Sequence, residues 1–229
     1  KAGGIATYEC SDPYEPEEVD AIEFGIKGFF NSGQTKMNAS IFNYDYTNFQ
    51  VIQVIGTQTV TKNAGLASVD GLEIEMSHNF SQALNMKFGY SYLDAVYDDF
   101  VNLNGLSPQL GLQQLKGNYL NHSPKNSLNL GLSYSKELTS GSLVIQVDSV
   151  FRSKTHFTEF NDYAQPAYSV FNLNILWKNS TDDLSLKFYV RNLGNEEYLT
   201  GFLNSASNGG RFGNYAQPRV FGLELTSKL

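Results

Sequence analysis

Apolar and polar residues alternate one by one in two segments near the end of the chain. The first segment covers residues 184–191, and its apolar positions are Leu184, Leu186, Phe188 and Val190. The second covers residues 218–229, and its apolar positions include Phe221, Leu223, Leu225 and Leu229. A period of two residues places successive side chains on opposite faces of a β-strand. The two segments therefore predict two strands, each with one apolar face and one polar face.

The same alternation recurs along the rest of the chain and predicts about nine strands in all. The earlier strands are expected at residues 22–30, 35–54, 63–75, 84–96, 124–134, 143–151 and 171–177. Short turns are expected at residues 31–34, 79–83, 136–141 and 178–183, and longer loops at 98–123, 155–166 and 195–217. The chain is thus predicted to be all-β and antiparallel, with short and long connections in alternation.

This arrangement favours a transmembrane β-barrel. No uninterrupted apolar run approaches the roughly 20 residues that a membrane helix needs, whereas most of the predicted strands are long enough to cross a bilayer. Outer-membrane barrels combine short periplasmic turns with long external loops and carry aromatic girdles at the interfaces. Aromatic residues near the predicted strand ends are Phe30, Tyr44, Tyr46, Tyr134 and Trp177. A half-buried soluble sandwich also alternates, but charged side chains on nearly every polar face suit a water-filled lumen better.

The shared phase of the strands predicts which side chains meet lipid and which meet the lumen. The side chains expected to face lipid are Leu130, Leu173, Ile175, Leu186 and Leu223. Those expected to face the lumen are Asn129, Asn174, Lys187 and Glu224.

Composition and charge exclude several other classes of protein. The net charge of −7 disfavours nucleic acid as a partner, because phosphate binding needs a basic surface. The single cysteine, Cys10, excludes a disulfide scaffold and a cysteine-rich zinc site. His78, His122 and His156 are far apart in the sequence, and the sequence contains no nucleophile elbow, phosphate-binding loop or zinc-protease motif. We therefore expect no catalytic residues, no metal site and no cofactor.

Two motifs near the end of the chain resemble the C-terminus of TonB-dependent outer-membrane receptors. The first has the form Asn-Leu-x-(Asn/Asp)-x-x-Tyr, and its residues here are Asn192, Leu193, Asn195 and Tyr198. The second has the form Pro-Arg-x-(Tyr/Phe)-Gly, and its residues here are Pro218, Arg219, Phe221 and Gly222. The order and spacing of the two motifs make the match specific. Similar segments upstream, at residues 16–27, 41–46 and 63–75, extend the resemblance over nearly the whole chain.

The resemblance implies that residues 1–229 are the C-terminal strands of a barrel of about 22 strands, with the plug domain and signal peptide absent from the sequence. It implies a location in the outer membrane of a Gram-negative bacterium and import of a scarce nutrient, most often a ferric siderophore. Energy would come from a TonB-type protein acting on the plug. A passive porin-like channel and an outer-membrane enzyme are the alternatives, and the resemblance does not name the substrate.

The resemblance also implies two further partners, outer-membrane lipid and the barrel-assembly machinery, which reads the final strand. Family members usually end in aromatic residues where this chain has Ser227 and Leu229.

Loop residues of suitable chemistry are the candidate ligand contacts. Aromatic rings and guanidinium groups suit an anionic, aromatic ferric chelate. The candidates are Tyr119, His122, His156, Tyr163, Arg211, Phe212 and Tyr215. The motif residues are expected to have structural roles instead: Asn192 would turn the chain, Arg219 would pair with lumenal carboxylates, and Gly222 would relieve crowding.

Overall fold

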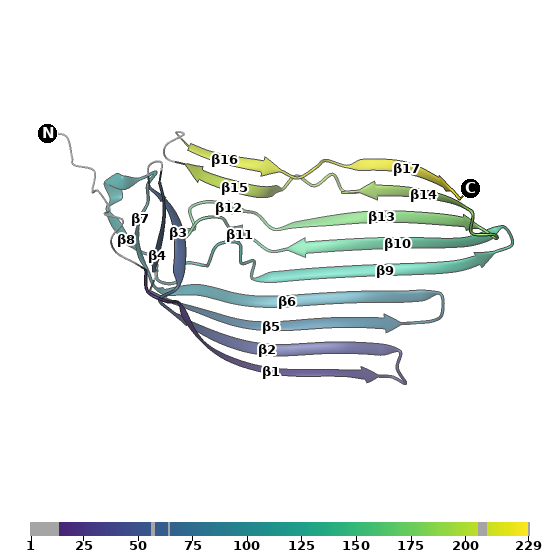
Figure 1. Ribbon diagram of the computed structural model, residues 1–229, viewed down its shortest axis with the longest axis horizontal. Coiled ribbons are helices and arrows are strands. Elements are labelled where there is room, and N and C mark those ends of the chain that lie inside the picture. Colours follow the sequence, from purple (N-terminus) through teal and green to yellow (C-terminus); the bar gives the residue numbers. More distant parts are fainter. Residues whose placement is uncertain (1–13, 56–57, 64, 206–209, 229) are drawn as a thin grey trace.

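The main feature of the computed structural model is one nine-stranded antiparallel sheet in the order β1-β2-β5-β6-β9-β10-β13-β14-β17 (Figure 1). The structure describes residues 14–55, 58–63, 65–205 and 210–228, so Cys10 and Leu229 lie outside the described residues. The strands are β1 (Glu18–Phe30), β2 (Thr35–Thr47), β5 (Leu66–Asn79), β6 (Leu84–Asp99), β9 (Asn126–Leu138), β10 (Gly141–Arg152), β13 (Tyr168–Asn179), β14 (Leu184–Arg191) and β17 (Val220–Ser227). The predicted fold class and strand number are confirmed.

Four small hairpins and one short 3-10 turn occupy the long connections at one end of this sheet (Figure 1). They are β3 (Gln50–Ile55) with β4 (Gln58–Asn63), β7 (Val101–Leu103) with β8 (Leu112–Gln114), β11 (Thr155–His156) with β12 (Ala164–Gln165), β15 (Leu199–Ser205) with β16 (Gly210–Tyr215), and η1 (Pro108–Leu110). The short turns and the last described residues lie at the opposite end. We call these two ends the loop end and the turn end.

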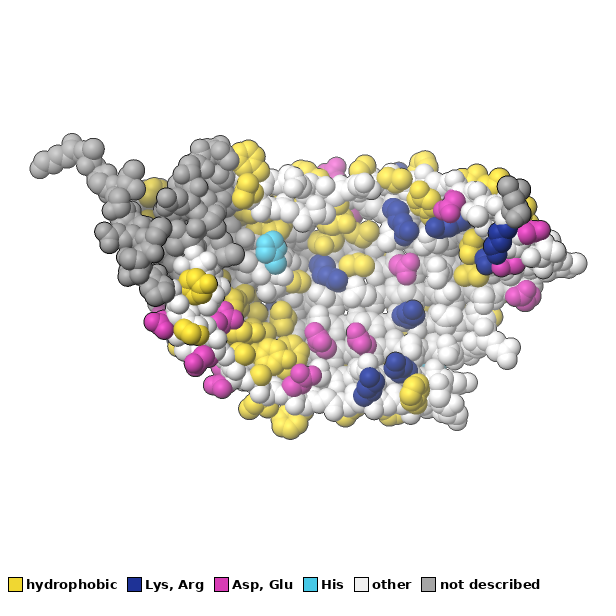
Figure 2. All heavy atoms as spheres, in the orientation of Figure 1, with side chains coloured by type: hydrophobic (Ala, Val, Ile, Leu, Met, Phe, Trp, Pro, Cys, Tyr) yellow, Lys and Arg dark blue, Asp and Glu magenta, His cyan; other side chains and the backbone are white. Residues whose placement is uncertain are grey.

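The two faces of the sheet differ in chemistry along the whole strand order. On one face Phe24 lies opposite Ile41, Ile41 opposite Leu72, and Leu72 opposite Tyr92. We call this the apolar face, and the other the polar face. Directly paired residues share a face, so the register confirms the two predicted sets, with the leucines and Ile175 on the apolar face and Asn129, Asn174, Lys187 and Glu224 on the other. Figure 2 shows the polar face, where lysine, arginine and acidic side chains spread over the middle of the sheet.

The apolar face is left uncovered by the rest of the described chain. The side chains of Phe24, Leu223 and Leu225 are about 70% exposed, at 69%, 70% and 69%. A continuous exposed apolar surface of this kind marks contact with a membrane or a partner. The described chain contains no helix long and apolar enough to cross a membrane.

Buried apolar packing is found at the loop end instead. Its members lie where β5 and β6 meet the segment that carries β7 and β8. The buried residues are Ala67, Ala95, Tyr97, Phe100, Leu115 and Leu120. The loop end is therefore a packed layer, whereas the middle of the sheet is a single layer.

The second predicted strand is shorter than expected. Its predicted range was 35–54, but β2 ends at Thr47, and the chain turns at Asn48, which has a φ of 55°. Asparagine tolerates this left-handed conformation better than most residues. The carbonyl of Asn48 accepts a hydrogen bond of 2.7 Å from the side chain of Asn63. β3 and β4 consequently form a separate hairpin, and Asn63, predicted in the third strand, ends β4.

The predicted turn at 136–141 is wrong in length, because β9 continues to Leu138 and β10 begins at Gly141. The long loops, predicted without regular structure, contain hairpins of their own.

Replacing Leu173 by arginine tests the assignment of the faces. Leu173 lies in the middle of β13 on the apolar face, between Val147 and Val190. Leu173→Arg should cost about 2–4 kcal/mol of folding free energy in a bilayer if this position lies near the midplane. Asn174→Arg, one residue along on the polar face, should cost much less. Denaturant titration of the receptor in lipid vesicles measures both, and equal costs would contradict the assignment.

Two glycines at the turn end provide a second test. Gly141 has a φ of 136°, and a Cβ built there would lie 1.9 Å from the carbonyl oxygen of Lys178. Gly33 has a φ of 86°, but a Cβ there meets nothing within 4 Å. Gly141→Ala should therefore cost about 3 kcal/mol or more, because strain and backbone collision add. Gly33→Ala should cost only about 1–2 kcal/mol of backbone strain. Urea midpoints in vesicles compare them, and a larger loss at Gly33 would refute the packing at Gly141.

Candidate ligand-binding site

The base of the last long loop is held by Asn192. Its φ of 52° turns the chain as it leaves β14, and its side chain is 5% exposed. The amide nitrogen of its side chain donates to the carbonyls of Glu196, at 2.9 Å, and Gln217, at 3.1 Å. The amide oxygen accepts from the backbone N–H of Glu196 at 2.8 Å. Asn192 therefore fastens both ends of the loop that carries β15 and β16.

The other motif residues make further contacts at the base of this loop. The backbone N–H of Arg219 donates to the Asn195 side chain at 2.9 Å, and its guanidinium donates to the Leu193 carbonyl at 3.3 Å. The Arg219 guanidinium makes no ion pair within the described ranges, so its pairing with a lumenal carboxylate stays a prediction. The Tyr198 ring stacks on Tyr168 with a centroid distance of 4.3 Å.

Gly222 makes room for an aromatic side chain on the neighbouring strand. Gly222 pairs with Tyr189, and a Cβ at Gly222 would lie 2.4 Å from the tyrosine ring. Pro218 precedes β17, and Phe221 lies on the apolar face, 68% exposed. Pro218, Phe221 and Gly222 thus lie at or just before the start of the last strand of the sheet.

Two successive long connections are tied together by Asn161. Its side-chain oxygen accepts the backbone N–H of Tyr119 at 2.7 Å. Its side-chain nitrogen donates to the carbonyls of Tyr119, at 2.9 Å, and Thr158, at 3.1 Å. The segment before β9 is thus joined to the hairpin between β10 and β13.

Glu159 strengthens the same junction from a half-buried position. Its carboxylate accepts a hydrogen bond of 3.1 Å from the Asn102 side chain, and its backbone carbonyl accepts one of 2.9 Å from Asn118. Burial raises the pKa of the Glu159 carboxyl above its ordinary value.

Four aromatic side chains from these connections pack together, and we call them the aromatic cluster: His122, Phe157, Tyr163 and Phe202. Phe202 stacks on Tyr163 at 4.5 Å and on Phe157 at 5.2 Å between ring centroids. His122 meets Phe157 edge-on at 5.5 Å. The Arg211 guanidinium lies 5.5 Å from the centre of the Tyr163 ring, within the range of a cation–π contact.

Asp162 receives hydrogen bonds from three different connections. The Thr158 hydroxyl donates to it at 2.6 Å, and the Asn104 amide donates to it at 3.4 Å. Arg211, on β16, forms an ion pair with the same carboxylate. The side chains of Arg211 and Asp162 are 35% and 31% exposed. Asp162 therefore fixes the arginine that borders the aromatic cluster.

Tyr119 and His156 lie on the other side of the loop end. Tyr119 bridges to Val96, which shares the apolar face with Tyr92 because an even number of residues separates them along β6. His156 stacks on Tyr119 at 5.8 Å, and burial lowers the pKa of its imidazole. Phe157 follows His156 and bonds to the Tyr163 carbonyl through its N–H at 3.0 Å. The aromatic cluster is accordingly on the side of the polar face.

The predicted ligand contacts thus separate into groups. His122, Tyr163 and Arg211 come together around the aromatic cluster, whereas Tyr119 and His156 form a pair on the opposite side. Phe212 and Tyr215 lie on β16 with side chains 51% and 71% exposed. The prediction omitted Phe157, Asp162 and Phe202. Phe157, Phe160 and Tyr163 around Asp162 made residues 157–163 an aromatic-rich segment, which was the available signal.

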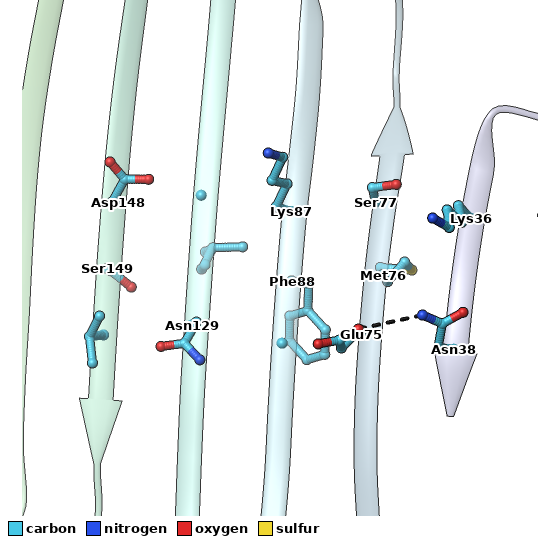
Figure 3. Close-up of a pocket in the computed structure, with 14 residues that line it drawn as sticks. Lys36, Asn38, Glu75, Met76, Ser77, Lys87, Phe88, Asn129, Asp148 and Ser149 are labelled. Atoms are coloured by element: carbon cyan, nitrogen blue, oxygen red, sulfur yellow. Dashed lines mark hydrogen bonds between the residues drawn. The ribbon is translucent and has the colours of Figure 1, made fainter. Parts of the chain in front are cut away.

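The polar face below the loop end has a hollow of about 610 Å³ (Figure 3). Lys36 and Lys87 border it together with Glu75 and Asp148, and the Asn38 side chain donates to Glu75 at 3.4 Å. Mixed charges of this kind suit a hydrated wall. Within the described part of the chain, no three histidine, cysteine or acidic residues are grouped as metal ligands.

Comparison with known proteins identifies relatives of this fold. A family model described as TonB dependent receptor-like, beta-barrel, matches residues 4–193. The probable TonB-dependent siderophore receptor PiuA of Acinetobacter baumannii is 28% identical over 193 residues, which are 81% of this chain and 24% of PiuA. The ferric-pyoverdine BN7/BN8 receptor of Pseudomonas putida is 21% identical over 217 residues, which are 95% of this chain and 23% of that receptor.

Solved structures show the same fold. The ferric yersiniabactin uptake receptor FyuA of Yersinia pestis superimposes with a TM-score of 0.74 at 16% identity, covering 92% of this chain and 30% of FyuA. The siderophore receptor PiuA of A. baumannii superimposes with a TM-score of 0.73 at 24% identity, covering 93% of this chain and 28% of PiuA. The chain therefore spans about a quarter to a third of the length of these relatives.

Replacing Asn161 by glycine tests the junction between the loops. Asn161 has a φ of 52°, which glycine also adopts, so Asn161→Gly removes the side-chain hydrogen bonds without straining the backbone. Residues 116–123 should then open more readily, by about 1–3 kcal/mol. Amide hydrogen exchange measures this change.

A matched control is Asn31→Gly at the turn end, where φ is also 52° and the side chain bonds only to Gln34 among the contacts described. Exchange at residues 116–123 should not change in this variant. Unaltered exchange in Asn161→Gly would show that Asn161 does not hold the loops.

Proposed function

Because the chain belongs to the TonB-dependent receptor-like β-barrel family, whose members are outer-membrane proteins of Gram-negative bacteria, we propose that it is the C-terminal part of a receptor that imports a ferric siderophore. PiuA is a siderophore receptor by name, and the other two relatives are named for ferric pyoverdine and ferric yersiniabactin. The observation that carries the proposal for this chain is the aromatic cluster. It joins three loops at one end of a strand wall that is apolar on one face and polar on the other.

The sheet supports the proposed role as a barrel wall. β1 and β17 are its open edges, and unpaired edge groups are too costly to leave in lipid. The proposal therefore adds further strands of the complete receptor, up to about 22 in all. The apolar face then contacts outer-membrane lipid, and the barrel-assembly machinery inserts the closed barrel.

The loop end supports the proposed role in binding. External loops of outer-membrane barrels are long, whereas periplasmic turns are short, so the loop end faces the outside of the cell. Its rings offer flat surfaces for the aromatic or chelating groups of a siderophore. The network around Asn161 and Asp162 holds these rings in place before any ligand arrives, which reduces the entropy that binding would otherwise cost.

We assign energy transduction and ligand release to parts of the receptor other than these strands. In the proposal a TonB-type protein of the inner membrane acts on a plug domain that fills the lumen. The hydrated wall around Lys87 and Asp148 is compatible with a polar domain or water beside it. A passive channel would share this wall but would not depend on an energised inner membrane.

Uptake of iron chelates by cells expressing the complete receptor tests the proposal. Phe202→Ala removes the ring that stacks on both Phe157 and Tyr163, so the apparent affinity for a transported ferric siderophore should fall about tenfold or more. Phe80→Ala, which removes an exposed ring at the turn end, is the control and should change little. Radioactive iron uptake at limiting chelate concentration gives both affinities.

The same assay separates the alternatives. Uptake should stop when the proton gradient is collapsed or when the TonB-type protein is deleted. Uptake that continues under both conditions would instead support a passive channel. Equal effects of Phe202→Ala and Phe80→Ala would show that the aromatic cluster is not part of the binding site.

A further inference from the structure

Two positive charges beside the predicted ligand residues are each paired with an acid. Arg211 pairs with Asp162 at the edge of the aromatic cluster. On the opposite side, Lys125 lies 5.9 Å from the centre of the Tyr119 ring and 3.2 Å from the carboxylate of Asp94. Arginine near aromatic rings suggested an anionic ligand from sequence alone. The pairing removes the net positive charge on which that suggestion depended.

Asp162 cannot easily turn away from Arg211. Its carboxylate also accepts hydrogen bonds from Thr158 and Asn104. An anionic group that took over the guanidinium would have to break this arrangement or remain next to a carboxylate. Like charges at contact distance in a partly desolvated site repel strongly. The half-buried Glu159, which is linked to the same network, adds a second acid nearby.

An uncharged aromatic ring is not repelled by the carboxylates of Asp162 and Glu159. It can stack against Phe202 or Tyr163, whose rings are already parallel within 21°. Arg211 can remain over Tyr163 and paired with Asp162 while the ring enters. Flat stacking of this kind needs no free cation.

We propose that Asp162 determines specificity at this site by masking Arg211, so that the cluster accepts an uncharged aromatic group of the ligand and rejects a carboxylated one. This inference rests on the proposed function, because it names the class of siderophore that the receptor imports. Asp162 is a positioning residue, since it acts through Arg211.

The first arm of the test needs no ligand. Phenylglyoxal modifies arginine, and mass spectrometry of the complete receptor gives the rate at Arg211. Asp162→Asn keeps the size of the side chain and an acceptor for Thr158 but removes the charge. Arg211 should then react about tenfold faster, as expected when roughly 1.4 kcal/mol of pairing is lost. Asp182→Asn, which alters a charged pair at the turn end, should leave the rate at Arg211 unchanged.

The second arm uses two matched ferric hydroxamate chelates, one carrying a phenyl group and the other a carboxyphenyl group. The wild-type receptor should bind the phenyl chelate at least about tenfold more tightly, and Asp162→Asn should abolish most of this preference. Arg211→Gln should make the preference stronger, because the carboxylate of Asp162 is then unmasked. Amide exchange at residues 116–123 confirms that the loops stay folded in each variant.

The outcomes distinguish the two proposals. Binding of neither chelate, and no uptake of any ferric siderophore, would overturn the proposed function together with this inference. Binding of both chelates with the same ratio in the wild type and in Asp162→Asn would overturn the specificity role alone. A wild-type receptor that prefers the carboxyphenyl chelate would also overturn it.

Discussion

The backbone of a strand in lipid has no water with which to form hydrogen bonds, and this constraint governs the structure. Each N–H and C=O group must find a partner in a neighbouring strand. The nine-stranded sheet meets this demand with uninterrupted pairing along most of each strand, for example over the whole of β1 and β2. Once the ladder is continuous, one face of every strand contacts the same medium. The alternation of leucine with asparagine, lysine and serine follows from that geometry and not from a buried core.

The loop end follows other rules because water surrounds it. Its connections need not pair their backbone groups in long ladders, so asparagine side chains do much of this work. Asn192, Asn161 and Asn48 each turn the chain with a positive φ. The side chains of Asn192, Asn161 and Asn63 donate hydrogen bonds to distant backbone carbonyls. A side-chain amide both donates and accepts, so one residue can fasten two segments. This makes the loops rigid without a large hydrophobic core.

The sequence was informative about the sheet because its signal is local. A period of two residues is visible within a single strand, so the nine strands and their faces could be predicted one at a time. The errors fall where local patterns compete. Gln50–Ile55 is rich in β-branched residues, which favour strands, so the break at Asn48 was not predicted. Residues 136 and 137 are charged and resemble the start of a turn, yet they lie in β9, which continues to Leu138.

The proposed binding site was less predictable because it is non-local. His122, Tyr163 and Arg211 were chosen by residue type, but their assembly depends on how three separate loops pack. Asp162 was overlooked, since an acid in a loop is usually solvated and unpaired. Its importance arises only when Arg211, 49 positions later, folds back onto it.

The same non-local pairing changes how charge in this protein should be interpreted. A net charge of −7 describes the chain but not any one site. At the aromatic cluster the positive group and the negative group are in contact, so their fields largely cancel beyond a few ångströms. In the proposed binding mode, a ligand therefore meets the shape and polarizability of four rings first, and charge acts mainly against groups that disturb the pair. Such a site would select its ligand by rejecting groups that disturb the Arg211–Asp162 pair. The polar face below the loops, where acidic and basic side chains are also mixed, is consistent with this kind of selection.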